Sequence, residues 1–335
     1  MARICFTRIH GKIRYTGEPL NHIMDVFYEF YLRFMVENPQ HEYTFYNCSF
    51  DGSTPKRDLT QLEGCDIFII PSENNFQYYI PGYFHTVQNK KWMDEVAKIE
   101  PYLARKKVIL FASDRADNEE LYREYTFPNI RFDFSKLDED DFTCGLHGMK
   151  YHYIRDFLET FLIEPPKKYD FVYWGCDKRK QAGGASSGDE RHKILKEIQK
   201  SHFDSFWIGR FANIKRDIKI RPMKEIIPYL AAGRYTLCFN WMSDTAITAR
   251  YHEAMACGVI PLVWKNYDST NRLVNPEEDF QRCRYTWNVL DLLYCTEEET
   301  SQWFNRIHAD YIKKLPTPEQ YYSEFSSQLL KILAI

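Results

Sequence analysis

Residues 249–263 read ARYHEAMACGVIPLV, and this stretch decides the fold. Ala254–Ala256 are small or flexible helix formers, and Gly258 stands where a helix ends in a left-handed cap. The apolar run 259–264 is typical of a strand buried on both faces of a parallel sheet. Glu253 falls about one turn before the predicted helix end, where a carboxylate can accept hydrogen bonds from both hydroxyls of a ribose. The stretch therefore predicts an α/β domain with a carboxylate beside its sheet.

Strands and helices alternate along the whole chain. In the first part we predict strands at 3–8, 66–71 and 107–112 and helices at 21–36 and 92–104. A helix at 149–162 is followed by Pro165-Pro166, and the alternation then starts again. We predict further strands at 169–175, 205–209 and 235–240, further helices at 189–201 and 222–232, and a last helix at 319–335. Such alternation indicates two parallel sheets with helical crossovers.

The string HEAMACGVIPLV, residues 252–263, resembles the donor-binding signature of glycosyltransferases with the two-domain GT-B fold. In that family the glutamate matching Glu253 binds the ribose of a nucleotide sugar. The resemblance implies an α/β chain of GT-B type with two Rossmann-like domains facing across a cleft. Residues 1–163 then form the acceptor-side domain, 164–318 form the nucleotide-sugar domain, and the helix 319–335 packs back on the first domain. The alternative is an unrelated α/β domain in which a helix capped by glycine precedes a strand.

The chain departs from the family pattern at one position. Retaining GT-B enzymes commonly carry a second glutamate eight residues before the first, and here that position is Thr245, beside Asp244. Either Asp244 substitutes for the missing glutamate or the sugar is held differently. The stereochemical course of a transfer therefore stays open.

Composition bounds the class of protein. The 335 residues are 44% hydrophobic, 16% aromatic and 27% charged, with a formal charge of −3, which is typical of a soluble globular protein without a global basic field. Nine cysteines lie without zinc-ligand spacing, which favours reduced thiols. The N-terminus lacks the apolar segment of a signal peptide, and no apolar run approaches the roughly 18 residues of a membrane span. We expect a cytoplasmic protein without membrane insertion, in the host cytoplasm if a phage encodes it.

Polar residues that follow predicted strands are the candidates for donor binding. The loop after 169–175 contains the cations 178–180 beside a Gly/Ser tract, and a diphosphate needs both charge neutralisation and close backbone approach. A solvated surface loop is the alternative. Ser243 or Asp244 could cap the helix that carries Glu253, whose N–H groups would face phosphate. The resemblance places donor phosphates on this basic loop and the base near Ile220. The candidate donor-binding residues are Lys178, Arg179, Arg210, Ile220, Ser243, Asp244, Thr245, Arg250 and Glu253.

The first domain holds the candidates for proton transfer and acceptor binding. Asp114 follows the predicted strand 107–112, where a general base could reach an acceptor hydroxyl, and His10 is the second candidate. A helix cap is the alternative role for Asp114. The loop 8–14 is basic and suits an anionic acceptor. The candidate catalytic residues are Asp114 and His10, and the candidate acceptor-binding residues are Arg8, Lys12, Arg14 and Glu73.

These observations predict a glycosyltransferase that moves a sugar from a nucleoside-diphosphate donor, a UDP-sugar, to a hydroxyl acceptor. No cofactor is required, and no residue cluster demands a metal. The compact length, reduced cysteines and aromatic-rich composition are similar to those of phage transferases that glycosylate hydroxylated bases in DNA, so double-stranded DNA is a candidate partner. Residues 167–221 contain 14 Lys and Arg against 7 Asp and Glu, which suits a phosphate backbone or an ordinary charged helix face. The alternatives are a GT-B enzyme for a glycan, lipid or protein, a sugar-nucleotide epimerase, and a non-catalytic nucleotide-sugar-binding protein.

Overall fold

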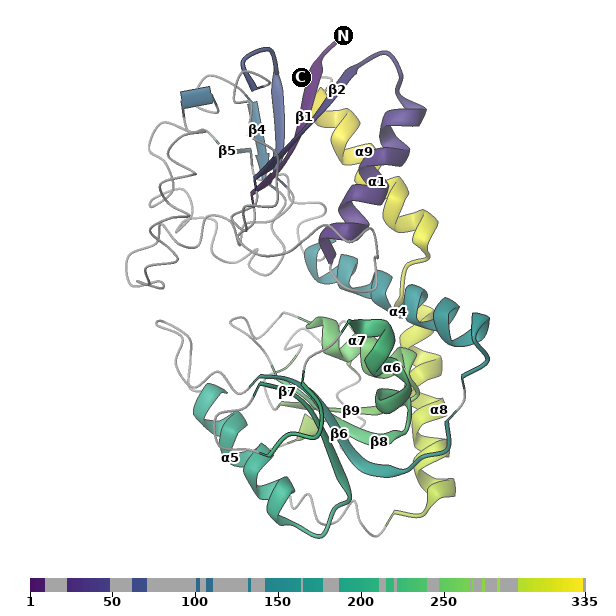
Figure 1. Ribbon diagram of the computed structural model, residues 1–335. Coiled ribbons are helices and arrows are strands. Elements are labelled where there is room, and N and C mark those ends of the chain that lie inside the picture. The colour runs from purple at the N-terminus through teal and green to yellow at the C-terminus, as the bar shows by residue number, and fades with distance from the viewer. Residues whose placement is uncertain are drawn as a thin grey trace. The chain divides into compact units, whose positions relative to one another are not determined.

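The computed structural model divides into two compact units, Met1–Leu146 with Glu319–Ile335, and His147–Pro318. Each unit contains a five-stranded parallel sheet with helices, so the expected α/β class of two Rossmann-like units is confirmed (Figure 1). The structure describes residues 1–9, 23–48, 62–70, 101–102, 107–110, 132–133, 142–163, 165–176, 187–210, 215–219, 222–239, 247–264, 267, 273–274, 282–283 and 295–333.

The first unit is built on a sheet with the strand order β2-β1-β3-β4-β5. All of its strand pairs are parallel. Ile4 and Phe68 lie buried on its two central strands because both faces of a parallel sheet are covered. Its elements are β1 (Arg3–Ile9), α1 (Ile23–Glu37), β2 (Glu42–Cys48), β3 (Ile67–Ile70), β4 (Lys107–Leu110), β5 (Phe132–Asp133) and α9 (Pro318–Leu333).

The C-terminal helix α9 packs against α1 within this unit. Phe325 is fully buried, and its ring centre lies 5.6 Å from that of Phe30 and 6.5 Å from that of Phe34. At the rim, the Arg33 guanidinium donates two hydrogen bonds to Glu319, of 2.6 and 2.7 Å. Aromatic burial supplies most of the stabilisation here, because exposed ion pairs contribute little.

The second unit is built on a sheet with the strand order β10-β9-β8-β6-β7, also parallel throughout. The helix α5 covers one face of this sheet, and α6 and α7 cover the other (Figure 1). Its elements are α4 (Phe142–Thr160), β6 (Tyr169–Cys176), α5 (Ser187–Lys200), β7 (Ser205–Arg210), α6 (Met223–Ala231), β8 (Gly233–Cys238), α7 (Ala249–Ala256), β9 (Ile260–Trp264), β10 (Arg282–Cys283) and α8 (Glu297–Lys314).

The fold-deciding stretch forms a helix, a tight cap and a buried strand, as its sequence predicts. Gly258 has φ +68°, and the N–H of Val259 donates to the carbonyl of Ala254 at 3.0 Å, which is the long hydrogen bond of a Schellman cap. The strand β9 follows at once, with Ile260 and Leu262 at most 2% exposed. The small residues of α7 let it lie directly on β8 and β9.

The start of α7 differs from the sequence-based expectation. The residue before the helix is Thr248, not Ser243 or Asp244. Its backbone N–H donates to the hydroxyl of Tyr267 at 2.7 Å, so a tertiary contact satisfies one N–H group of this helix terminus. Capping by Ser243 or Asp244 was a wrong prediction, because the helix begins several residues later.

The division of the chain also differs from the predicted boundary near residue 163. It falls at 146/147, so most of α4 belongs to the second unit. The cause is side-chain packing, since Tyr151 of α4 contacts His308 and Tyr311 of α8. Pro165-Pro166 only separates α4 from β6 inside that unit. None of the helices described is long and apolar enough to cross a membrane.

Candidate functional site

The second sheet has a topological switch point between β6 and β8. The chain passes from β6 to β7 on one side, then returns to place β8 on the other side of β6. Crossovers diverge at such a point, and the carboxyl ends of the two strands leave a crevice where ligands of α/β proteins bind. Cys176 and Cys238 end these two strands, and the N-terminal half of α7 lies nearby.

Glu253 of α7 is the central group of this region. It is only 5% exposed, and its carboxylate accepts a hydrogen bond on each oxygen. The Lys150 ammonium of α4 donates to Oε1 at 2.5 Å, and the Trp174 indole N–H of β6 donates to Oε2 at 2.6 Å. Burial alone would raise the pKa of Glu253, but Lys150, Trp174 and the charge of Arg250 together lower it below its ordinary value. Glu253 is therefore an ionised carboxylate held by donors from two elements.

Arg250 lies one helical turn before Glu253 and reaches the carboxyl end of β6. Its guanidinium carbon is 4.8 Å from the ring centre of Tyr173 and 5.6 Å from that of Trp174, which are cation–π distances. A methyl group built on Gly175 would lie 2.3 Å from Arg250 Nη2, so this guanidinium occupies space that only glycine leaves open. Gly175 also has φ +140°, a conformation that residues with side chains rarely adopt. A cation therefore stands beside the carboxylate at the switch point.

A buried polar contact links α7 to α8. His252 is completely buried, and its Nδ1 lies 2.7 Å from the hydroxyl of Tyr311 on α8. Burial, reinforced by the charges of His147, Lys150 and His152, holds the pKa of His252 well below 6.5. His252 is therefore neutral at physiological pH and fixes the helix rather than facing a ligand.

The structure brings two of the predicted site residues together, Arg250 and Glu253. For Arg8 and Arg210 it describes the backbone alone, at the carboxyl ends of β1 and β7. The remaining predicted residues lie outside the described part of the chain: His10, Lys12, Arg14, Glu73, Asp114, Lys178, Arg179, Ile220, Ser243, Asp244 and Thr245.

Sequence reasoning missed Lys150, Trp174 and Gly175. Lys150 is 103 positions from Glu253, and no local pattern links the two. Gly175 carried a usable signal, because a glycine at the carboxyl end of a buried strand often marks close approach by another group.

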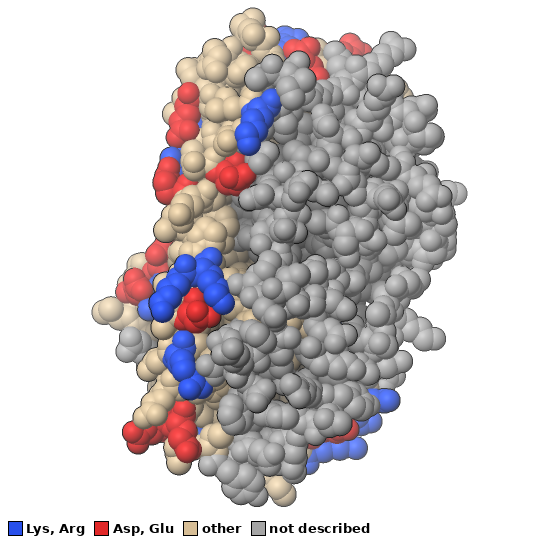
Figure 2. All heavy atoms as spheres, turned by 180° about the vertical axis from the view of Figure 1, so that it is seen from behind, with Lys and Arg blue, Asp and Glu red and all other residues tan. Residues whose placement is uncertain are grey.

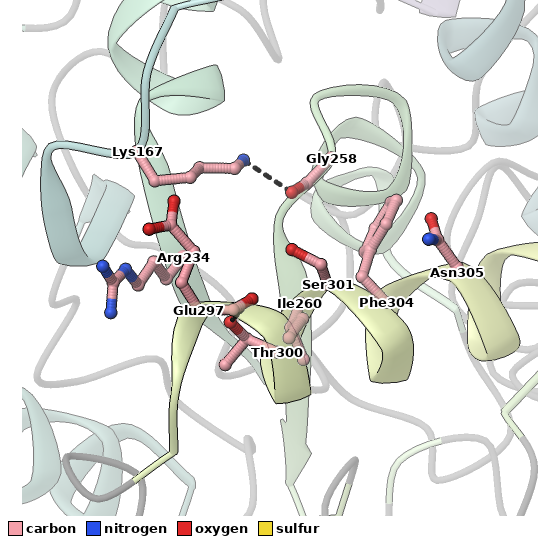
Figure 3. Close-up of a pocket in the computed structure, with 9 residues that line it drawn as sticks. All are labelled: Lys167, Arg234, Gly258, Ile260, Glu297, Thr300, Ser301, Phe304 and Asn305. Atoms are coloured by element: carbon pink, nitrogen blue, oxygen red, sulfur yellow. Dashed lines mark hydrogen bonds between the residues drawn. The ribbon is translucent and has the colours of Figure 1, made fainter.

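A small cavity of about 120 Å³ lies at the opposite, amino edge of the same sheet (Figure 3). There the ammonium of Lys167 donates hydrogen bonds to the carbonyl oxygens of Ala231 and Gly258, with N···O distances of 2.9 and 2.6 Å. Desolvation lowers the pKa of Lys167 to about 8. The lysine caps the ends of α6 and α7, so we assign it a structural role. The cavity is lined by Lys167, Arg234, Gly258, Ile260, Glu297, Thr300, Ser301, Phe304 and Asn305.

In this chain of two parallel α/β units, a carboxylate and a guanidinium lie at the switch point of the second sheet, where α/β proteins bind ligands. Solved structures of UDP-sugar glycosyltransferases are among those similar to the chain. An α-glucosyltransferase in complex with UDP and a DNA containing an HMU base is 13% identical, with 98% of this chain and 99% of that chain covered and a TM-score of 0.44. Anabaena HepE in complex with UDP-glucose is 10% identical, with 100% of both chains covered and a TM-score of 0.46.

An α,α-trehalose-phosphate synthase (UDP-forming) from Burkholderia vietnamiensis is 8% identical, with 100% of this chain and 97% of that chain covered and a TM-score of 0.45. No family model matches the sequence, and no curated protein matches it.

Proposed function

We propose that the chain is a glycosyltransferase that moves a sugar from a nucleoside-diphosphate donor, a UDP-sugar, to a hydroxyl acceptor. One observation carries the proposal: Glu253 is a buried, ionised carboxylate beside Arg250 at the switch point of the second sheet. A carboxylate accepts hydrogen bonds from a ribose diol, and a guanidinium binds phosphate. Both groups lie where α/β folds bind nucleotides.

The proposed chemistry follows from charge. Breaking the anomeric C–O bond leaves positive charge on the sugar and negative charge on the departing diphosphate. Cations at the site stabilise the diphosphate, and a general base takes the proton of the acceptor hydroxyl. We assign the first role to Arg250 with Lys178, Arg179 and Arg210, and the second to Asp114 or His10. Ile220, Ser243, Asp244 and Thr245 complete the proposed donor site, and Arg8, Lys12, Arg14 and Glu73 the proposed acceptor site.

For the acceptor we propose a hydroxylated or hydroxymethylated pyrimidine in double-stranded DNA. The support is an exposed basic surface on the second unit, formed by α5 and the segment 215–219. Gln199 links the two, since its side chain bonds the backbone N–H and carbonyl of Lys215 at 3.1 and 2.7 Å. Basic side chains gather at the place of α5 (Figure 2). The surface carries the exposed basic residues Lys193, Lys196, Lys200, Lys215, Arg216 and Lys219 beside the exposed Glu197 and Asp217.

A base in a duplex must leave the stack to present its hydroxyl, so phosphate contacts have to hold the DNA during transfer. Each phosphate contact adds close to one unit to the slope of log K against log salt concentration. Replacing Lys193, Lys196 and Lys200 together by Gln should reduce that slope by about two to three units. Lys313→Gln, an exposed lysine on α8, is the control and should leave the slope unchanged.

The donor assignment is tested by measuring UDP release from a panel of UDP-sugars with wild type and Glu253→Gln. Loss of one charged hydrogen-bond partner should weaken UDP binding by about 1 to 3 kcal/mol, roughly fivefold to 150-fold. Glu159→Ala removes an exposed glutamate of α4 and should leave both UDP affinity and UDP release unchanged. Unchanged affinity in Glu253→Gln would overturn the ribose role. UDP binding without turnover would indicate a binding protein, and conversion of the sugar without UDP release would indicate an epimerase.

The acceptor assignment is tested by mass spectrometry of nucleosides after incubation of hydroxymethylated duplex DNA with mixed donors. A nucleoside heavier by one sugar is expected. Active donor hydrolysis with unmodified nucleosides would exclude DNA and favour a glycan, lipid or protein acceptor.

A further inference from the structure

The two oxygens of Glu253 are each held by a donor from a different element. Lys150 of α4 fixes one oxygen and Trp174 of β6 fixes the other, so the carboxylate cannot rotate without breaking a short hydrogen bond. Each carboxylate oxygen can accept two hydrogen bonds. Counting the described residues alone, one acceptor position per oxygen therefore remains for a diol once Lys150 and Trp174 are in place.

The two donors differ in charge. The indole N–H of Trp174 is neutral and orients the carboxylate, whereas the ammonium of Lys150 also compensates its charge. The Lys150 side chain is 12% exposed and the Glu253 side chain 7% exposed, so water screens this pair weakly. Without the ammonium, a buried carboxylate takes up a proton at a higher pH, and a protonated carboxyl accepts fewer hydrogen bonds from a diol.

In the part of the chain that the structure describes, the other titratable groups that face Glu253 are Arg250 and the thiols of Cys238 and Cys257. Burial raises the pKa of both thiols to about 12, so they carry no charge at neutral pH. Arg250 is stacked over Tyr173 and Trp174 and acts on Glu253 by its charge at a distance. Among the cations of the described residues, Lys150 is thus the one in direct contact with the carboxylate.

We propose that Lys150 is a positioning residue for donor binding, which keeps Glu253 ionised and oriented so that it can accept both ribose hydroxyls of a nucleoside-diphosphate sugar. This inference rests on the proposed function. Lys150 acts through Glu253 and does not touch the donor. It should therefore affect donor affinity and the pH dependence of that affinity more than the rate of sugar transfer.

The test measures the Kd of UDP by calorimetry, and KM and kcat for donor hydrolysis, between pH 5.5 and 8.5 in wild type, Lys150→Met and Lys150→Arg. Lys150→Met should raise Kd and KM on the order of 10- to 100-fold at neutral pH while kcat changes little. Its affinity should also recover partly as pH rises, because the freed Glu253 ionises only at higher pH. Lys150→Arg keeps the charge and should stay within a few-fold of wild type at all pH values.

Two further variants keep the test decisive. Arg155 lies on the same helix as Lys150 and forms an exposed ion pair with Glu159. Arg155→Met breaks only this pair, so its UDP affinity should match that of wild type at every pH. Lys150→Gln keeps a hydrogen-bond donor but removes the charge, and it replaces Lys150→Met in the test if that variant does not fold. Its UDP affinity should depend on pH in the same way as that of Lys150→Met, with a smaller loss of affinity. Wild-type affinity in Lys150→Met or Lys150→Gln, or an equal and pH-independent loss in the Gln and Arg variants, would overturn the inference but leave the proposed function standing. Failure of wild type to bind any nucleoside diphosphate would overturn both.

Discussion

Replacing Gly175 by alanine adds one methyl group at the carboxyl end of β6, next to the guanidinium of Arg250. The new carbon would lie 2.3 Å from Arg250 Nη2 and 3.4 Å from Arg250 Cζ, so the guanidinium has to leave its place over Tyr173 and Trp174. Adopting φ +140° costs an alanine about 1 to 3 kcal/mol. Loss of the ring contacts adds about 0.5 to 2 kcal/mol. We expect a total destabilisation of about 1.5 to 5 kcal/mol.

In a unit of this size, each kcal/mol shifts the Tm by about 2 to 4 °C, so Gly175→Ala should lower the Tm by about 3 to 20 °C. Gly258→Ala is the matched control at the amino edge. Its φ is +68°, but the added carbon would be 3.6 Å from Lys167 Nζ, an ordinary contact. It should cost only the conformational strain, about 1 to 2 kcal/mol.

The assays are thermal unfolding followed by circular dichroism, and UDP affinity by calorimetry. Gly175→Ala should also weaken UDP binding about tenfold or more, because Arg250 no longer holds its position. Gly258→Ala should bind UDP like wild type. Equal Tm losses in the two variants, or wild-type UDP affinity in Gly175→Ala, would refute the claim that Gly175 makes room for a ligand-binding Arg250.

Three further predictions concern stability. The pKa of His252 in the folded protein lies well below 6.5, so the unfolded chain takes up the proton first and the free energy of unfolding falls as pH drops below 6.5. His252→Asn should reduce this loss of stability, measured by urea titrations at pH 7.0 and 5.5. An unchanged loss in His252→Asn would contradict the prediction. Lys167 has a folded pKa of about 8 against 10.5 unfolded, so stability should rise between pH 8 and 10.5, and Lys167→Met should flatten that rise in thermal melts. In urea unfolding, Phe325→Ala should destabilise the first unit by about 3 to 5 kcal/mol and Arg33→Ala by about 0 to 1 kcal/mol. The reverse order would show that the ion pair, rather than aromatic burial, stabilises the contact between α1 and α9.

Interior strands of both sheets were predictable because their patterns are local. β3 and β9 are short apolar runs buried on both faces, and the cap at Gly258 has a distinct sequence signature. β2 was not predicted, because its alternating polar and aromatic residues favour no buried parallel strand until β1 pairs with it. α8 was also missed, although Thr296 and Glu299 form a capping box that the sequence displays.

The candidate site was only partly predictable for a related reason. Glu253 stands out because its helix, cap and strand are contiguous in the chain. Its partners Lys150 and Trp174 come from elements 103 and 79 positions away, and only tertiary packing brings them to the carboxylate. A lysine in a helix usually forms a solvated charge, so its burial against Glu253 has no counterpart in local pattern.

The most direct measurement of the central claim is a crystal structure of the protein with UDP-glucose bound. We predict both ribose hydroxyls at about 2.6 to 3.2 Å from the carboxylate oxygens of Glu253, with Lys150 and Trp174 still donating to the same group. A nucleotide bound elsewhere, or a ribose turned away from this carboxylate, would contradict the account.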